Sequence, residues 1–196
     1  MQEEEAGPSP AASEPLLSAD DKQTLLRLAR QTLVEYLETG EITHATVDSR
    51  ALLTPRATFV TLRQRDSGEL RGCRGEFAPR HALHESVQRM VVASAVDDPR
   101  FPAVTAEEVP NLHIEISALT PLRPITPEEV VVGRHGLMII RGNYSGLLLP
   151  QVPIEQGWNR TEFLDGLCWK AGLPRNAWMS HQAQLYGFEA DVWGEE

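Results

Sequence analysis

The chain has 196 residues, of which 41% are hydrophobic and 23% are charged, as in soluble globular domains with a packed core. Its net charge is −10, with six acidic residues and no basic one in residues 1–21. This balance argues against nucleic-acid binding, which needs a basic surface. The acidic start and the lack of a long apolar run argue against a signal peptide and a membrane span, so we expect a cytoplasmic protein.

The amino-terminal segment, residues 1–19, is rich in proline and alanine and lacks hydrophobic periodicity, which predicts a disordered tail. The folded domain is expected at residues 20–194. Ser18 is a helix-capping residue, apolar side chains then recur at helical spacing, and Gly40 is a helix stop. This pattern predicts an amphipathic helix of about five turns.

The rest of the chain alternates strand and helix patterns. Strands are predicted at 59–62, 112–119, 136–140, 146–149 and 185–193, and helices at 83–94, from Thr126 and from Asn159 to Gly172. A turn at 66–68 makes a hairpin whose second arm leads into Gly72 and Cys73, and residues 97–102 form a loop. Without a regular strand–helix–strand repeat, the fold class is α+β, with mainly antiparallel sheets and helices packed on them.

Eight short segments follow one another along the chain: Phe59–Leu62, Leu70–Gly75, Asp98–Phe101, Ile114–Ser117, Gly136–Leu137, Leu148–Val152, Gly157–Trp158 and Lys170–Leu173. Their order resembles that of AMMECR-type domains, the family of AmmeMemoRadiSam system protein A. The chain resembles this family over about residues 22–193. One departure concerns the signature LRGCIG, in which Arg74 replaces the usual apolar residue.

The resemblance implies a two-lobed fold with a cleft, in which the two lobes share one core. It also implies that the protein functions together with a Memo-like protein and a radical-SAM enzyme. The biochemical activity of the family is undefined, so the resemblance supplies no reaction and leaves open whether the chain is an enzyme. It supplies no oligomeric state either.

Cys73 is the strongest candidate for a chemically reactive residue. Gly72 and Gly75 allow a tight turn and close approach of a ligand, and Arg71 and Arg74 would favour the reactive thiolate and an anion. Cys73 is therefore a nucleophilic, redox-active or metal-binding cysteine in an anion-receptive loop, or else a small buried residue that closes a turn.

Other polar residues are secondary candidates. Glu115 would be a catalytic acid or base, or else the partner of an arginine. Arg100 would clamp a carboxylate or phosphate, or else close its loop through Asp98 or Glu115. His135 precedes a family segment and is a further ligand-binding candidate.

No cofactor or metal is expected. Two cysteines, Cys73 and Cys168, are too few for an iron–sulfur cluster, and neither has zinc-site spacing. His81 and His84 are three residues apart but lack a third ligand, so we interpret them as residues of a solvated helix face. Cys168 lies on an apolar helix stripe and is expected to be a buried core thiol.

Two hypotheses follow for function. The first is a small-molecule site between the lobes, with residues 71–75 as its floor and with Glu115 and Arg100 as supporting groups. The second is a non-catalytic interaction module that uses the same segment as its contact surface. They differ in whether Cys73 lies in a concave pocket or in an exposed apolar patch.

Overall fold

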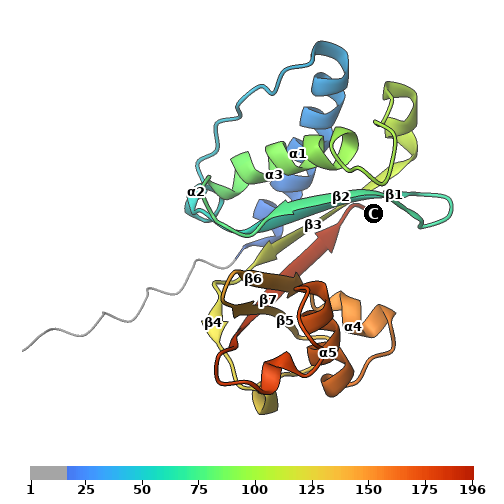
Figure 1. Cartoon of the computed structure of the whole chain (residues 1–196). Helices are drawn as coiled ribbons and strands as arrows, with labels where there is room; N and C mark the ends of the chain where they lie inside the picture. Colours follow the sequence, from blue (N-terminus) through green and yellow to red (C-terminus); the bar gives the residue numbers. More distant parts are fainter. Residues whose placement is uncertain (1–16) are drawn as a thin grey trace, which may run out of the picture.

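The computed structural model of the chain describes residues 17–196, so the predicted tail lies outside the described residues up to residue 16. The α-helices are α1 (Ala19–Thr39), α2 (Arg50–Leu53), α3 (Leu83–Val96), α4 (Gln151–Glu155) and α5 (Arg160–Lys170) (Figure 1). The strands are β1 (Thr58–Gln64), β2 (Leu70–Glu76), β3 (Leu112–Leu119), β4 (Arg123–Pro124), β5 (His135–Arg141), β6 (Tyr144–Leu148) and β7 (Gln184–Gly194). Three 3₁₀ helices, η1 (Ala106–Asn111), η2 (Pro127–Glu129) and η3 (Ala177–Met179), complete the fold.

The predicted α+β class is confirmed, and the local signals explain why. The Ser18 hydroxyl accepts the N–H of Asp21 at 3.1 Å, and the Asp21 carboxylate accepts the N–H of Ser18 at 2.9 Å, which starts α1. Gly40 ends α1 with a φ of 76°. Asn159 and Glu162 cap α5 by the same reciprocal pattern.

All strands form one curled antiparallel sheet, in the order β2-β1-β3-β7-β5-β6, with β4 paired to β7. Helices α1 and α3 cover one face of β1, β2 and β3 in the first lobe, while α5 packs beside β5 and β6 in the second (Figure 1). The end strands β2 and β6 therefore belong to different lobes.

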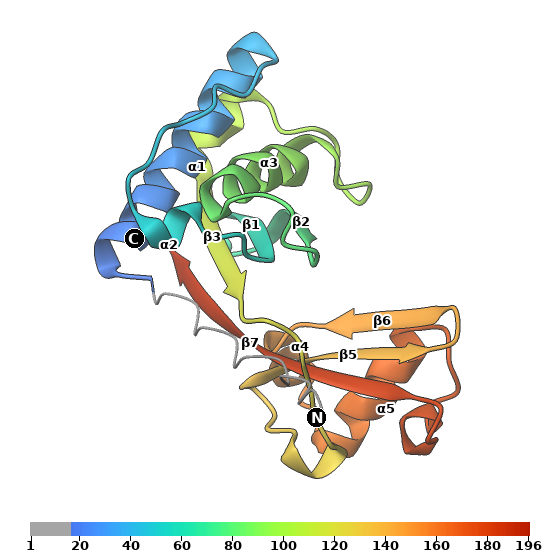
Figure 2. The same ribbon diagram turned by 90° about the vertical axis from the view of Figure 1, so that its left-hand side faces the viewer.

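Strand β7 is the element that both lobes share. Its residues 190–194 pair with β3 and its residues 184–189 pair with β5, so it runs from one lobe into the other (Figure 2). Side chains on a strand alternate between faces. Phe188 and Val192 belong to the concave face between the lobes, whereas Leu185 and Trp193 pack against the hydrophobic cores.

The buried hydrophobic residues form two clusters, one in each lobe. Leu25, Val91 and Ile116 are fully buried in the first cluster, and Leu137 and Phe163 are fully buried in the second. The first cluster lies between α1, α3 and the sheet, and the second lies between α5 and the sheet. A single core shared by both lobes stays a prediction, and the physical link that the structure shows is the backbone of β7.

The histidines interpreted as a solvated pair differ in the structure. His84 is buried, and its Nδ1 lies 3.1 Å from the carbonyl oxygen of Leu52, so the interpretation is wrong for His84. Its ring helps to hold α2 against α3. Over residues 17–196, no helix combines the length and apolarity needed to cross a membrane.

Glu195 ties the carboxyl end of the chain to the first lobe. Its carboxylate accepts hydrogen bonds from Arg30, from Arg65 at 3.1 Å and from the N–H of Ile114 at 3.0 Å. Burial by itself raises the pKa of the Glu195 carboxyl, but the bonds from Arg30 and Ile114 outweigh it and hold this pKa below its usual range.

Replacing Glu195 tests this anchor. Glu195→Gln should lower the free energy of unfolding at pH 7 by about 2 kcal/mol, because Arg30 loses its charged partner in a half-buried site. The lowered pKa stabilises the fold above the unfolded value of about 4.3, and this contribution is lost as the pH falls through the folded pKa. Urea unfolding should therefore show the difference between the two proteins shrinking below about pH 4.

Glu189→Gln is the matched control, because the Glu189–Arg134 pair is solvent-exposed. It should cost less than about 1 kcal/mol. Equal losses in the two variants would show that Glu195 is not an anchor.

Candidate functional site

The segment around Cys73 is a strand rather than a turn. Residues 70–76 are extended in β2, and neither Gly72 nor Gly75 has a positive φ. The expected anion-cradling turn is therefore wrong. The backbone N–H of Cys73 donates to Asp98 Oδ2 at 2.9 Å, so it is not free for a ligand.

The two glycines instead allow close packing. A Cβ at Gly72 would lie 2.0 Å from the backbone oxygen of Ser94 in α3, and a Cβ at Gly75 would lie 2.2 Å from the Phe59 ring. Ser94 also accepts the N–H of Arg74 at 2.8 Å and donates to the oxygen of Val60 at 2.7 Å. Gly72 therefore lets α3 lie directly on β1 and β2.

Cys73 lies on the concave face of the sheet. It pairs with Thr61 on β1, whose Oγ1 lies 3.4 Å from Cys73 Sγ, and Thr61 pairs with Glu115 on β3. The two catalytic candidates are thus in one cross-strand row with Thr61 between them. Two strand spacings separate Cys73 and Glu115 by about 10 Å, too far for direct proton transfer.

Asp98 organises the surroundings of Cys73. Besides the Cys73 N–H, its buried carboxylate accepts bonds from Arg100 Nε at 2.9 Å and Arg100 Nη2 at 2.7 Å. These bonds hold the pKa of the Asp98 carboxyl far below its usual range. The Asp98 carboxylate raises the pKa of the Arg100 guanidinium through a hydrogen bond and charge attraction. Arg100 is therefore a cation placed beside Cys73.

The two arginines that flank Cys73 in sequence have different environments. Arg71 is buried and bonds the Glu108 carboxylate at 2.8 and 3.1 Å and the Pro102 oxygen at 2.9 Å. The Arg71 guanidinium holds the pKa of the Glu108 carboxyl below its usual value. Arg71 is thus engaged in joining β2 to the segment before β3, while Arg74 is exposed at the edge strand.

His135 lies in the second lobe, on β5, and the structure does not bring it together with Cys73. Its Nδ1 accepts the N–H of Val131 at 3.1 Å, and its Nε2 lies 4.0 Å from Glu189 Oε1. Burial lowers the pKa of the His135 imidazole. Glu115 faces a different part of the cleft, and its side chain forms no hydrogen bond or ion pair among residues 17–196.

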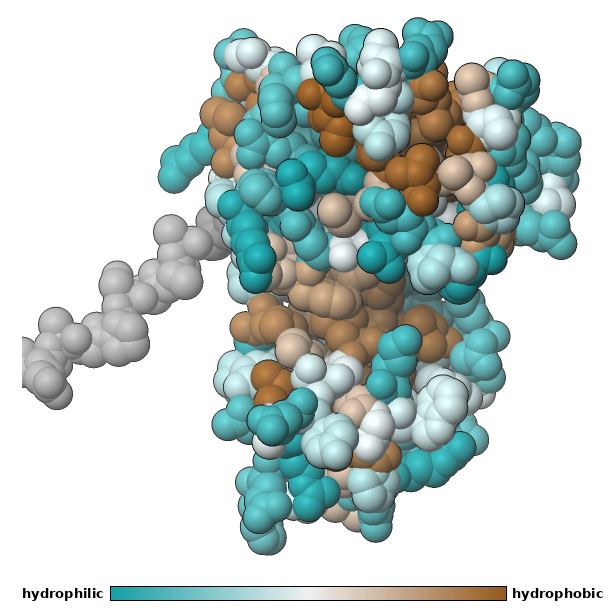
Figure 3. Space-filling view, turned by 45° about the horizontal axis from the view of Figure 1, so that its top comes forward, coloured by the Kyte–Doolittle hydropathy of each residue, from teal (hydrophilic) through white to brown (hydrophobic). Residues whose placement is uncertain are grey.

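A cleft between the lobes follows the concave face of the sheet. Figure 3 shows a hollow apolar band between them. Its central cavity has a volume of about 560 Å³ and is bounded by Phe59 and Arg100 from the first lobe and by Met138, Leu148 and Lys170 from the second. An apolar cavity of about 250 Å³ adjoins it, and a polar cavity of about 590 Å³ contains Glu115.

The described residues that line the central cavity include two cations and no acidic residue. Arg100 and Lys170 are the charged residues that line it among the described residues. Arg100 keeps 56% of its side chain exposed although Asp98 binds it, and Lys170 is exposed at the end of α5. The cleft can therefore hold an anion between a cation from each lobe.

Within residues 17–196, no three histidine, cysteine, aspartate or glutamate side chains lie close enough together to hold a metal ion. Cys168 is fully buried, as predicted, and burial raises the pKa of its thiol.

Comparison with known proteins decides the family. The AMMECR1 family model matches residues 26–193. The chain belongs to the AMMECR1 family. It is similar to a protein of Pyrococcus abyssi, PYRAB00100, with 43% identity over 182 residues, covering 88% of this chain and 89% of that protein. It is 42% identical to Methanopyrus kandleri MK0488 over 188 residues, covering 92% and 91%.

The AMMECR1-family fold is also seen in a crystal structure of the uncharacterised protein PH0010 from Pyrococcus horikoshii. That structure matches with a TM-score of 0.81 and 44% identity, covering 88% of this chain and 90% of that one. The agreement supports the two-lobed arrangement described above.

Three residues of this AMMECR1-family site are not identified by local sequence patterns. Thr61 has only strand alternation to mark it, and its pairing with Cys73 depends on the register of the hairpin. Asp98 is indicated only as a partner of Arg100, although it lies in a family segment. Lys170 lies in a family segment and could reach a cleft, but its sequence pattern favours a solvated lysine at a helix end.

Gly72→Ala tests the packing role of the motif glycine. The added methyl group would meet the backbone of α3, which cannot rotate away, so the variant should lose about 2–4 kcal/mol of stability. Gly75→Ala meets the Phe59 side chain instead and should lose less, because a ring can reorient. Thermal and urea unfolding measure both, and an unaffected Gly72→Ala protein would contradict the assignment.

Proposed function

We propose that this AMMECR1-family protein binds a small anionic molecule in the cleft between its lobes, with Cys73 as the thiol that contacts or attacks it. The observation that carries the proposal is the central cavity, in which Arg100 and Lys170 approach one cleft from opposite lobes without an acidic residue in the lining. The cavity volume of about 560 Å³ is within the range of small-molecule sites.

The first-lobe side of this site is preorganised. The Asp98 carboxylate accepts two hydrogen bonds from the Arg100 guanidinium and one from the Cys73 backbone N–H. These bonds fix the position of the guanidinium relative to the residue that carries the thiol. Arg100 Nε and Nη2 are engaged, and Nη1 is left to bind an anion. Asp98 acts here as a positioning residue.

The thiol side supports contact or nucleophilic attack. Cys73 is half-buried on the concave face, and the Thr61 hydroxyl is its hydrogen-bonding neighbour at 3.4 Å. Cys73 does not itself line the central cavity, but its backbone N–H and Arg100 Nη2 share Asp98 Oδ2, which places the thiol near a cation of that cavity. Glu115 would exchange a proton with this group only through Thr61, water or the ligand itself.

The alternative is a non-catalytic interaction module that uses the same segment. Two observations favour the small-molecule site: Cys73 is on the concave face, and Arg100 and Lys170 both line the central cavity of the cleft. The family resemblance adds a Memo-like protein and a radical-SAM enzyme as proposed partners in the cytoplasm. Co-purification of the full-length proteins tests that part of the proposal separately.

Alkylation of Cys73 by two matched reagents tests the anion site. Iodoacetate and iodoacetamide differ in charge, and each forms a carbon–sulfur bond with the thiolate as iodide leaves. The iodoacetate-to-iodoacetamide rate ratio at Cys73, measured by peptide mass spectrometry, should exceed the ratio for free glutathione. Lys170→Gln should lower it about two- to fivefold, the size of one partly exposed charge interaction, and Lys170→Arg should preserve it.

The chain supplies two controls. Lys22 is the only other lysine and pairs with Asp191 outside the cleft, so Lys22→Gln should leave the ratio unchanged. Cys168 should stay unlabelled until the protein unfolds. The proposal fails if Cys73 shows no preference for iodoacetate, or if Lys170→Gln and Lys22→Gln behave alike.

A further inference from the structure

The apolar cavity next to the proposed anion site has no role in binding charge. It is lined chiefly by Ala57, Phe77, Leu119, Leu122, Leu147 and Phe188, and no charged side chain lines it among the described residues. Thr120, the one polar side chain in the lining, already accepts the N–H of Glu189 at 2.8 Å. The cavity therefore offers a ligand mainly apolar contact, with the Thr120 hydroxyl as the one polar side chain among the described residues that line it.

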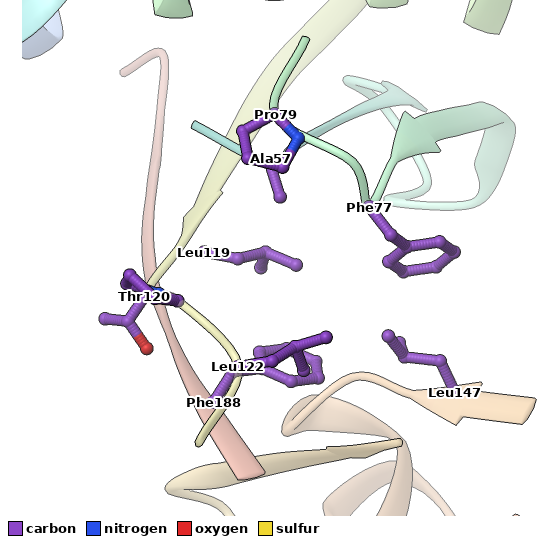
Figure 4. A pocket seen from close by; sticks show the side chains of 9 residues that line it. Ala57, Phe77, Pro79, Leu119, Thr120, Leu122, Leu147 and Phe188 are labelled. Atoms are coloured by element: carbon purple, nitrogen blue, oxygen red, sulfur yellow. The ribbon is translucent and has the colours of Figure 1, made fainter. Parts of the chain in front are cut away.

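The apolar and central cavities adjoin each other. Phe77 and Leu147 line both of them, and in Figure 4 these two side chains face each other from opposite lobes across the opening. One molecule can thus place an apolar part beside Phe188 and Leu119 and a charged part beside Arg100 and Lys170.

The size of the apolar cavity limits what fits. Its volume is about 250 Å³, whereas an apolar cavity of about 150 Å³ in another protein accommodates benzene. One aromatic ring, or an aliphatic chain of roughly six to ten carbons, is therefore of suitable bulk. Phe77 and Leu122 keep 44% and 41% of their surfaces exposed, so part of their apolar surface remains available for a ligand to cover.

We infer that the ligand of the cleft is an amphipathic anion, with one acidic head group between Arg100 and Lys170 and an apolar tail in the Ala57–Phe188 cavity. The inference rests on the proposed function and adds the chemical class of the ligand. The head group has the shared chemistry of a carboxylate or a phosphate monoester. The tail supplies affinity through burial of apolar area, about fourfold for each methylene group.

Calorimetric titration with straight-chain carboxylates from propionate to decanoate tests the tail, using the full-length protein. Affinity should rise about fourfold per methylene and then level off at roughly six to ten carbons, when the cavity is full. Alkyl phosphates of the same lengths distinguish the two head groups, and the neutral hexanamide should bind at least fivefold more weakly than hexanoate.

Ala57→Leu fills the cavity at its wall and should abolish most of the length dependence while leaving propionate binding unchanged. Its backbone carbonyl, which accepts the N–H of Leu119 at 2.9 Å, is retained. Ala106→Leu makes the same change at an exposed site in η1 and should behave as the wild type. Lys170→Gln should weaken every chain length by the same factor.

The outcomes separate the two proposals. If short anions bind in a Lys170-dependent way but chain length has no effect, the amphipathic ligand is wrong and the anion site stands. The amphipathic ligand is equally wrong if Ala57→Leu keeps the full length dependence. If no anion of any length binds and Lys170→Gln does not change Cys73 alkylation, both proposals fail.

Discussion

The architecture depends on one strand that is hydrogen-bonded in both lobes. Residues 190–194 of β7 complete the sheet of the first lobe, and residues 184–189 complete that of the second. Because side chains alternate along this strand, one set packs on the helical cores and the other contributes to the cleft. The cleft floor is therefore continuous backbone, and the relative placement of Arg100 and Lys170 is set by a sheet rather than by a flexible linker.

Within this frame, a few contacts explain the sequence of the AMMECR1 signature. Gly72 brings α3 onto the sheet, and Asp98, which follows α3, is then close enough to accept the N–H of Cys73. Asp98 in turn fixes Arg100. The segment is thus more than a reactive cysteine with basic neighbours in sequence, because its electrostatic partner arrives from a loop 25 residues later.

Local sequence patterns predict much of the fold. The features that they do not predict depend on contacts between segments that are distant in sequence. The Ser18 cap, the strand at 112–119 and the apolar stripe around Cys168 each depend on a few neighbouring residues, and each is confirmed. The strand character of Gly72 is not predicted, because glycine is disfavoured in strands unless another backbone approaches closely. The backbone that approaches Gly72 is that of Ser94 in α3. Ser94 is distant in sequence, so the spacing of residues around Gly72 does not predict this contact.

The placement of β7 also affects how the protein is made. The second lobe is inserted between β3 and the strand that completes the first lobe, so a ribosome must synthesise β4, β5, β6 and β7 before β3 gains its second neighbour. Until then, the hydrophobic strand β3 presents an open edge that could pair with other nascent chains. Truncated chains that stop before β7 should therefore bind chaperones more than other truncated chains of similar length.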